Sequence, residues 1–432
     1  MRIVRPMLLR AVRSAALRAC LGAMVLAGCQ TTGTAPTAAA PPPKGTSPKP
    51  TVPPSTDSAD FAQWLAGLRA EAVGQGIRPA TFDRAFARVR LSPRIIELDS
   101  AQPEFTRMVW SYLDSAVSDA RVQKGRAKIQ ENSALFTRVS REYGVPAEIL
   151  AAFWGVESDF GRDTGTFAVV DALTTLAFNG RRAAYFRSEL LVALKILDSG
   201  DIAPERMTGS WAGAMGQTQF MPTIFQRYAV DEDGDGRRDI WTSMPDVLAS
   251  TARFVRGNNW QPGERWGDEV RLPAGFPYDQ AELTVVKPVS EWRRMGVRLM
   301  NGAEPEGDAT PAAILLLAGA EGPAFLVREN FRAIMRYNPS TSYALAVALL
   351  ADRMAGRSGI AAPWPRHEQP LSKDERLELQ QRLADMGYEP GTPDGIIGPS
   401  TRNAARRFQA AAGMVPDGFV TKALLERMRR GV

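Results

Sequence analysis

The sequence contains almost no cysteine and almost no histidine. Among 432 residues there are two cysteines, Cys20 and Cys29, and one histidine, His367. A Cys/His zinc site, a Ser-His-Asp triad and a Cys-His pair all require these side chains, so the composition excludes them. His367 lies in a proline-rich stretch, which favours an exposed linker residue over a catalytic one. Acid/base chemistry must therefore come from carboxylates, tyrosines or lysines.

The chain also has little net charge once its first residues are set apart. The formal charge is +6, and the stretch before Cys29 holds five arginines and no acid, so its removal leaves +6 − 5 = +1. A nearly neutral chain gives little support for a nucleic-acid partner, and we expect none. The five residues are Arg2, Arg5, Arg10, Arg13 and Arg18.

Residues 1–28 have the pattern of a secretory signal peptide. The arginines precede an apolar run, residues 19–28, which is far shorter than the ~20 residues of a membrane-spanning helix. Leu26-Ala-Gly-Cys29 resembles the lipobox of bacterial lipoproteins, in which the cysteine is lipidated and becomes the new N-terminus. A plain cleaved signal peptide is the alternative. Gln30 follows Cys29 where an Asp would retain a lipoprotein, so the resemblance predicts a periplasmic protein anchored to the outer membrane.

Residues 29–58 are predicted to form a tether. They are rich in Pro, Thr and Ala and have few large apolar side chains, so they cannot bury enough surface to offset the entropy of ordering. Their prolines favour an extended chain. We expect this segment to link a lipid anchor to a folded body.

Residues 59–356 are predicted to form a mainly α body with a small β insertion. Apolar periodicity begins with Phe61, Leu65 and Leu68, which share one helix face. The clearest strand-like alternation lies in a Gly/Pro-rich region, so we place a β insertion near residues 261–310 and expect helix to resume over 312–317. The helices are expected at 61–72, 81–86, 109–117, 133–143, 146–156 and 342–354, and the strands at 269–272 and 282–286.

A single carboxylate ends an apolar helix in the segment Ala-Ala-Phe-Trp-Gly-Val-Glu157. Burial disfavours the charged form and raises the pKa of a carboxyl, and a carboxyl protonated near neutral pH can donate to a glycosidic oxygen. Asp159 is two residues away, on roughly the opposite helix face, so it is a poor second carboxylate for a glycosidase. From local chemistry alone, a structural ion pair explains Glu157 equally well.

The segment from Gly209 to Pro222 alternates small residues with polar ones. Small residues allow a ligand to approach the backbone closely, although a tight, closely packed turn explains the glycines equally well. The side chains available for hydrogen bonds or sugar stacking are Ser210, Gln217, Gln219, Trp211 and Phe220.

Three segments in this order resemble the membrane-bound lytic murein transglycosylase B family. They are Glu157-Ser-Asp-Phe-Gly, Gly209–Pro222 and Arg336-Tyr-Asn-Pro-Ser-Thr-Ser-Tyr343, within a similarity that spans residues 60–356. The resemblance implies a lysozyme-like α fold. It also implies that Glu157 is the sole acid/base, which acts on the bond between N-acetylmuramic acid and N-acetylglucosamine.

The same resemblance implies a reaction without water and without a catalytic cofactor. The muramoyl 6-hydroxyl attacks the anomeric carbon and leaves a 1,6-anhydromuramoyl end. Substrate-binding residues implied by the motif positions are Ser210, Gln219, Tyr337, Asn338, Tyr343 and, less directly, Tyr112. Two alternatives remain open: a non-catalytic peptidoglycan-binding lipoprotein, and a hydrolytic muramidase, which needs a second carboxylate about 5–9 Å from the first.

An acidic loop resembles the start of an EF-hand calcium loop. Its Asp-x-Asp-x-Asp-Gly pattern suits Ca²⁺, and Gly236 permits the sharp turn. The usual Glu at position 12 is replaced by Thr242, and the family closes a longer loop with a later Asp. An acidic surface turn without metal is the alternative. The expected ligands of a structural Ca²⁺ are Asp231, Asp233, Asp235, the backbone carbonyl of Arg237, and Asp246.

The C-terminal residues 372–431, after a linker at 357–371, resemble the three-helix peptidoglycan-binding domain. The motif includes Leu379-Gln-Gln-Arg-Leu383 and Asp394-Gly395, and we expect Phe408 to lie in the core. Helices are expected at 373–386, 399–412 and 421–430. The partners implied are peptidoglycan glycan strands and, through the anchor, a membrane, and we expect a monomer.

Overall fold

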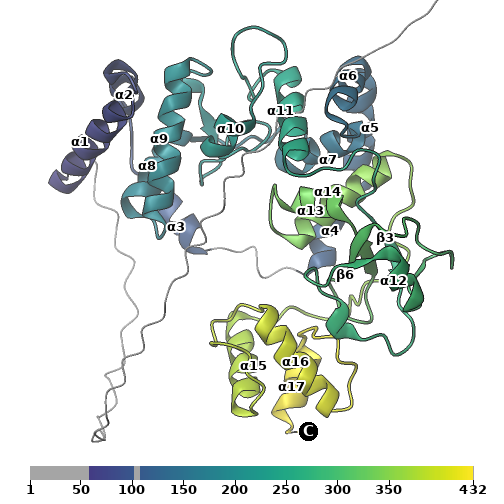
Figure 1. Cartoon of the computed structure of the whole chain (residues 1–432). Helices are drawn as coiled ribbons and strands as arrows, with labels where there is room; N and C mark the ends of the chain where they lie inside the picture. The colour runs from purple at the N-terminus through teal and green to yellow at the C-terminus, as the bar shows by residue number, and fades with distance from the viewer. Residues whose placement is uncertain (1–57, 102–107, 432) are drawn as a thin grey trace, which may run out of the picture. The chain divides into compact units, whose positions relative to one another are not determined.

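A computed structural model describes residues 58–101 and 108–431 (Figure 1). The signal peptide, most of the tether and Cys29 lie outside the described residues. Within the described part of the chain, no helix is both long enough and apolar enough to cross a bilayer. The structure is mostly helical, with one small sheet and a separate C-terminal helical bundle, which confirms the predicted fold class.

Fourteen helices of the described chain belong to the body that precedes residue 357. They are α1 (Ala59–Gly74), α2 (Pro79–Phe86), α3 (Pro93–Ala101), α4 (Val109–Ala116), α5 (Asp119–Glu131), α6 (Ser133–Tyr143), α7 (Ala147–Ser158), α8 (Val169–Asn179), α9 (Ala183–Ser199), α10 (Pro222–Tyr228), α11 (Met244–Gly257), α12 (Val289–Arg294), α13 (Glu329–Met335) and α14 (Thr341–Met354).

Helix α7 lies at the centre of the main hydrophobic core. Eight of its twelve residues are buried, and it packs against α14 on one side and against α5, α6 and α11 on others. A helix that is apolar nearly all round is stable only when neighbours cover every face. Pro146 precedes its first turn, where a missing N–H costs little, and Asp159 ends it with a left-handed φ of 47°. The core therefore fixes the end of α7 in space.

The β insertion is a five-stranded antiparallel sheet in the order β4-β6-β7-β3-β5. A two-stranded pair, β1 with β2, lies elsewhere in the body. The sheet strands are β3 (Gly267–Arg271), β4 (Lys287–Pro288), β5 (Arg298–Leu299), β6 (Pro311–Leu316) and β7 (Ala324–Val327), and the pair is β1 (Phe167–Ala168) with β2 (Thr208–Gly209).

Two predictions for this region are wrong. Residues 312–317 fall largely in strand β6 and not in a helix, and residues 282–286 contain no strand. Strand β6 is paired on both edges and buried on both faces. A short apolar run without alternation therefore fits a buried strand as well as a buried helix. The predicted strand at 269–272 corresponds to β3.

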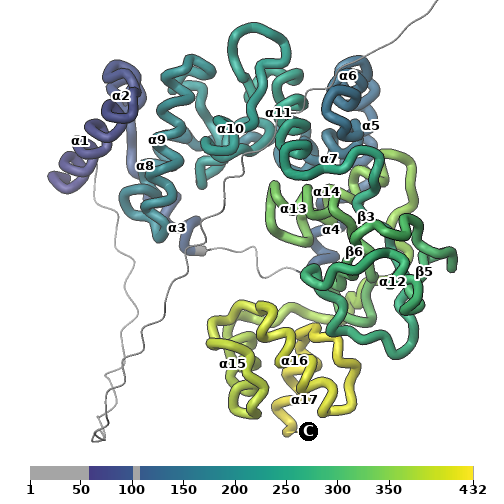
Figure 2. Tube along the Cα trace, in the orientation of Figure 1, coloured from purple at the N-terminus to yellow at the C-terminus, as the bar shows by residue number. Residues whose placement is uncertain are grey.

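The C-terminal bundle consists of α15 (Lys373–Asp385), α16 (Pro399–Ala411) and α17 (Lys422–Arg429), as Figure 2 shows in yellow. The three helices match the predicted ones within two residues. Ser372 and Glu375 form a reciprocal capping box at the start of α15. Phe408 is 5% exposed and belongs to the core of the bundle, as predicted.

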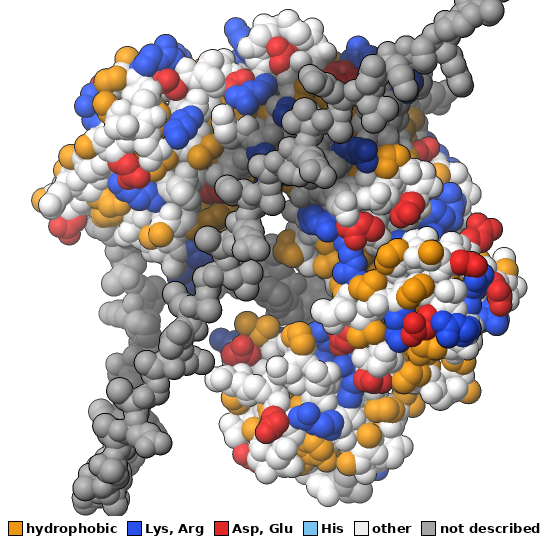
Figure 3. Space-filling view, in the orientation of Figure 1, with side chains coloured by type: hydrophobic (Ala, Val, Ile, Leu, Met, Phe, Trp, Pro, Cys, Tyr) orange, Lys and Arg blue, Asp and Glu red, His pale blue; other side chains and the backbone are white. Residues whose placement is uncertain are grey.

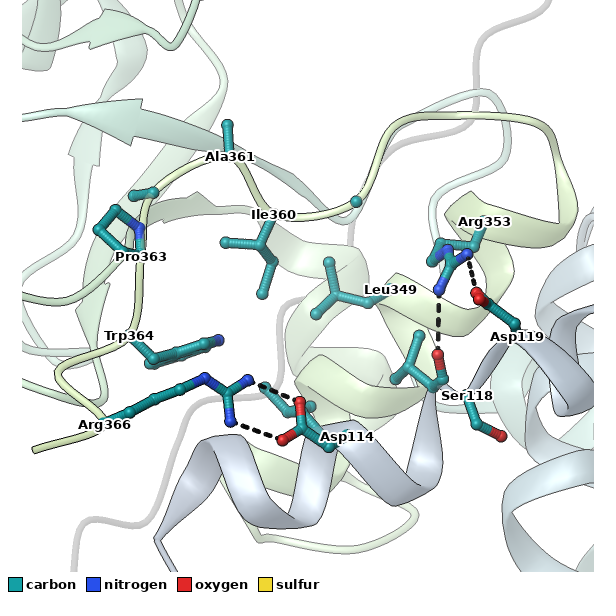
Figure 4. A pocket seen from close by; sticks show the side chains of 14 residues that line it. Asp114, Ser118, Asp119, Leu349, Arg353, Ile360, Ala361, Pro363, Trp364 and Arg366 are labelled. Atoms are coloured by element: carbon teal, nitrogen blue, oxygen red, sulfur yellow. Dashed lines mark hydrogen bonds and ion pairs between the residues drawn. The ribbon is translucent and has the colours of Figure 1, made fainter.

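The segment after α14 is attached to the body over part of its length. Arg366 forms a two-point ion pair with Asp114 of α4, with N···O distances of 2.7 and 2.9 Å. The Trp364 ring lies 6.0 Å from that of Trp110. This segment lines an open cavity of about 680 Å³ together with residues of α4 and α14, among them Asp114 and Leu349 (Figure 4). None of the predicted catalytic or substrate-binding residues lines it.

The burial of α7 predicts a large effect for one substitution. Leu150→Ala removes a fully buried side chain and should lower the free energy of unfolding by about 2–5 kcal/mol, because a cavity remains. Urea unfolding followed by circular dichroism measures the change. Gln226→Ala, on the exposed side of α10, should change stability by less than about 0.5 kcal/mol. Equal effects of the two substitutions would contradict the central place of α7.

Candidate active site

Glu157 lies in the last turn of α7, and the Tyr343 hydroxyl donates a hydrogen bond to its Oε1. Tyr343 stands in the first turn of α14, which begins where Ser340 Oγ accepts a hydrogen bond from Tyr343 N at 3.3 Å. Burial raises the pKa of the Glu157 carboxyl to about 7, and the hydrogen bond from Tyr343 opposes part of this rise. The residue keeps a partly accessible face. At neutral pH, Glu157 is therefore partly protonated and can be reached by a ligand.

Aromatic rings form a wall beside Glu157. The rings of Tyr337 and Tyr343 are nearly parallel, with centroids 6.4 Å apart and 15° between planes. Phe153 of α7 lies behind them, 4.7 Å from Tyr337. Tyr337 donates its hydroxyl to the carbonyl of Thr218. Burial, and then the charge of Glu157, keep the pKa of both tyrosines well above the usual value, so both hydroxyls stay neutral donors.

The segment after β2 is a tight turn closed by Ser210. Ser210 Oγ accepts hydrogen bonds from Ala212 N at 3.3 Å and Ala214 N at 3.1 Å. A Cβ on Gly209 would lie 2.0 Å from the carbonyl oxygen of Ala214, so only glycine fits. Both readings of this segment, a packed turn and a ligand-facing one, are thus compatible with its glycines.

Gln219 adopts a left-handed backbone, with φ of 50°, which is uncommon for a side chain of this type. Its Nε2 donates to the carbonyls of Thr164, at 3.0 Å, and Gly216, at 2.8 Å. Its amide oxygen accepts no hydrogen bond from the described residues. Backbone strain of this kind persists where surrounding contacts hold it, commonly at ligand sites. The geometry leaves one polar atom of Gln219 available to a ligand.

Two of the side chains that the sequence suggested for hydrogen bonds or sugar stacking, Gln217 and Phe220, are used inside the core. Gln217 accepts from Trp154 Nε1 at 2.8 Å and donates to the carbonyl of Trp241 at 2.8 Å, so its amide is used within the core. Phe220 is 1% exposed and packs against Phe254 and Tyr337. The expectation of a stacking face at Phe220 and a free amide at Gln217 is wrong, because Phe220 is buried against Tyr337 and the Gln217 amide is used within the core.

Asp159 points its carboxylate at three cations and not at Glu157. The N···O distances are 2.7 Å to Arg162, 3.0 Å to Lys124 and 3.8 Å to Arg121. The electrostatic environment of Glu157 includes no second carboxylate among the described residues. This agrees with the expectation that Asp159 is a poor catalytic partner.

The structure places Asn338 and Tyr112 at the edges of this region. Asn338 is exposed, and its Oδ1 accepts from Ser340 N at 3.0 Å, which shapes the turn into α14. Tyr112 of α4 lies close enough to act electrostatically on the Tyr343 hydroxyl.

Sequence reasoning missed two supporting residues. Ser158 Oγ donates to the carbonyl of Gln217 at 2.8 Å and accepts from Gly161 N at 3.1 Å. It thereby ties the end of α7 to the segment after β2. Phe153 supports the tyrosine wall from behind. The sequence shows the Ser158 hydroxyl next to Glu157, but it does not show that this hydroxyl bonds to Gln217, which lies far along the chain.

The acidic loop brings together three of the five expected metal ligands. Single oxygens of Asp231, Asp233 and Asp246 all lie within 4.8 Å of one another. Burial raises the pKa of Asp246 to about 6, although backbone N–H groups oppose the rise. Asp235 accepts only from Arg237 N, at 2.9 Å, and is not part of this group. Three carboxylate oxygens at one point suit a hard divalent cation, so the donor set fits Ca²⁺.

A lone, half-protonated carboxyl in a helical body, backed by neutral tyrosines, defines a glycan-cleaving enzyme of the lysozyme-like class. The chain belongs to the lytic transglycosylase family. Residues 60–352 match the model described as "Transglycosylase SLT domain", and residues 372–428 match "Putative peptidoglycan binding domain".

Known proteins place the chain in the same family. It is 34% identical to membrane-bound lytic murein transglycosylase B of Escherichia coli over 251 residues, 56% of this chain and 66% of that protein. SltB3 from Pseudomonas aeruginosa, solved with NAG-anhNAM-pentapeptide, is 50% identical. That alignment covers 86% of this chain and all of the other, with a TM-score of 0.84. The Escherichia coli lytic transglycosylase Slt35, solved with calcium, is 28% identical over 69% of this chain and 93% of the other, with a TM-score of 0.59.

The hydrogen bond from Tyr343 predicts a shift in the pH profile. A general acid must be protonated, so kcat/KM on soluble peptidoglycan fragments should fall as pH rises through about 7. Tyr343→Phe removes a contact that favours the charged carboxylate, and the alkaline limb should move to higher pH. Tyr337→Phe is the matched control, because the Tyr337 hydroxyl bonds to the carbonyl of Thr218. The alkaline limb of this variant should stay where it is in the unaltered protein. If the alkaline limb of Tyr343→Phe stayed in place or moved to lower pH, that result would contradict the role of the Tyr343 hydroxyl.

Proposed function

We propose that the protein cleaves the β-1,4 bond between N-acetylmuramic acid and N-acetylglucosamine in peptidoglycan and leaves 1,6-anhydromuramoyl ends. The observation that carries this proposal is Glu157, whose pKa is about 7 and on which no second carboxylate of the described residues acts. A hydrolytic enzyme with two carboxylates needs a partner to activate water or form a covalent bond. A single carboxyl suffices when the substrate supplies its own nucleophile.

The first step is protonation of the leaving group. The Glu157 O–H gives its proton to the glycosidic oxygen, the bond from the muramoyl C1 to that oxygen breaks, and the N-acetylglucosamine end departs as a neutral alcohol. The positive charge left on the sugar is shared with its 2-acetamido group. Glu157 is now a carboxylate, and the hydrogen bond from Tyr343 stabilises that form.

The second step restores the acid. Glu157 accepts the proton of the muramoyl 6-hydroxyl while O6 forms a bond to C1, which closes the anhydro ring. One bond is broken and one is formed, the proton returns to Glu157, and no water is consumed. A pKa near 7 suits a group that must first give and then take a proton.

The residues around Glu157 would hold the glycan strand. The turn at Ser210, the free amide oxygen of Gln219 and the exposed Asn338 supply polar contacts, with Tyr112 nearby. Tyr337 and Tyr343 form the wall that excludes water from the carboxyl. The C-terminal bundle would raise the local concentration of the enzyme at the polymer.

Glu157→Gln tests the proposal, because the amide cannot exchange the proton. Mass spectrometry of digested peptidoglycan should show anhydromuropeptides from the unaltered protein and at least a thousandfold less from the variant. Glu148→Gln, on the first turn of the same helix, should retain normal turnover. Reducing ends in place of anhydro ends would show a muramidase. No product from the unaltered protein would show a non-catalytic binding protein.

We infer that the protein acts in cell-wall remodelling as a monomeric lipoprotein. Cys29 in its lipobox would carry the lipid, Gln30 would direct the protein to the outer membrane, and the proline-rich tether would place the body in the periplasm. The relative from Escherichia coli named as membrane-bound supports this location.

We also propose that Asp231, Asp233 and Asp246 hold a structural Ca²⁺ ion. The solved relative with calcium supports this assignment. Asp246 already accepts hydrogen bonds from Glu232 N, at 2.8 Å, and Asp239 N, at 2.7 Å. A bound ion would offset the repulsion among the three carboxylates and fasten the loop to α11.

Calcium should therefore raise the Tm of the protein. An ion that binds only the folded state adds about 2.7 kcal/mol at a hundredfold excess over Kd. Asp233→Ala should abolish the increase measured by calorimetry, whereas Asp235→Ala, outside the ligand group, should keep most of it. A Tm that is equal with calcium and with a chelator would rule out the site.

A further inference from the structure

A second cavity of about 570 Å³ lies between α2, the C-terminal end of α9, the 3₁₀ turn Pro204–Arg206 and the acidic loop. None of the predicted catalytic or substrate-binding residues lines it. Four arginines do, from three separate segments: Arg78, Arg84, Arg206 and Arg237. Figure 3 shows Lys and Arg side chains interspersed with Asp and Glu over the part of the molecule where Figure 1 places α2 and α9. Aliphatic side chains, including Leu197 and Ile202, complete the lining.

Two of the four arginines are held by carboxylates. Arg78 Nε lies 2.8 Å from Asp198 Oδ1, and Arg84 Nη2 lies 2.9 Å from Glu205 Oε2. The guanidinium of Arg88 also acts on the Glu205 carboxylate. These ion pairs orient two of the four guanidinium groups.

The other two arginines are unpaired. Arg206 and Arg237 are exposed, and neither has an ion pair or a side-chain hydrogen bond to any described residue. The described residues that line the cavity include four arginines and no Asp or Glu. A concave site with a cationic lining attracts an anion.

The position of Arg237 is set by the loop that carries it. Gly236 N donates to Asp231 Oδ2 at 2.9 Å, and Arg237 N donates to Asp235 Oδ1 at 2.9 Å. These hydrogen bonds hold the backbone at Arg237, which is one of the residues that line the cavity. The arginine is thus presented by an ordered turn.

We propose that this cavity is a phosphate-binding site. Guanidinium groups bind phosphate through two parallel hydrogen bonds each, and a phosphate has enough oxygens to engage Arg206 and Arg237 together. The aliphatic lining would accommodate the carbon chain of a phosphate ester. An anionic phospholipid headgroup and free phosphate share this chemistry. The inference does not depend on the proposed reaction at Glu157.

Calorimetric titration of the full chain at low ionic strength tests the proposal. Inorganic phosphate and glycerophosphoglycerol, the soluble headgroup of phosphatidylglycerol, are the two probes, with glycerol as the neutral control. We expect saturable binding that weakens as NaCl is added. Tighter binding of the diester assigns the site to a lipid headgroup, and tighter binding of inorganic phosphate assigns it to the free ion.

Paired variants make the test specific. Arg206→Ala with Arg237→Ala should raise the Kd at least tenfold and leave peptidoglycan turnover unchanged. Arg69→Ala with Arg94→Ala removes the same charge from exposed positions elsewhere and should leave the Kd unchanged. No saturable binding, equal loss in both double variants, or citrate binding more tightly than either phosphate would overturn the proposal.

Discussion

The burial of one carboxyl at the end of α7 is the constraint on which the rest of the site depends. Burial alone would raise the pKa of Glu157 further and make its carboxyl a weaker proton donor, and full solvation would leave it without a proton to give at neutral pH. The hydrogen bond from Tyr343 sets the balance near 7. That single contact joins residues 186 positions apart, so the packing of α14 against α7 is a chemical requirement as well as a structural one.

A polar network behind Glu157 holds this balance in place. Ser158 and Trp154 both bond to Gln217, and Gln217 in turn bonds to Trp241. Buried polar groups are costly unless each finds a partner, and here nearly every one does. The network therefore fixes the segment after β2 relative to the end of α7. A rigid frame of this kind preserves the geometry that a single acid/base needs.

Local patterns in the sequence predicted the helices that have a clear apolar face, including α7, α14 and the C-terminal bundle. They failed where the surroundings of a segment decide its structure. Residues 312–317 fall largely in a strand, because neighbouring strands pair with both of its edges and both of its faces are buried, and no local pattern contains that information. The same limit applies to the site. The family resemblance, and not local chemistry, pointed to Glu157, and the inward roles of Gln217 and Phe220 depend on Trp154, Trp241 and Phe254, which are distant in sequence.

The small net charge of the whole chain does not exclude a local gathering of positive charge, which the fold creates. A nearly neutral chain gave little support for a nucleic-acid partner, yet folding places Arg206 and Arg237 in one cavity without ion-pair partners among the described residues. The loop that presents Arg237 also carries Asp231 and Asp233. If both proposed sites exist, Ca²⁺ would neutralise these carboxylates and thereby strengthen the attraction of the cavity for phosphate. By thermodynamic reciprocity, phosphate would strengthen calcium binding by the same factor, so the two sites would act as one coupled unit.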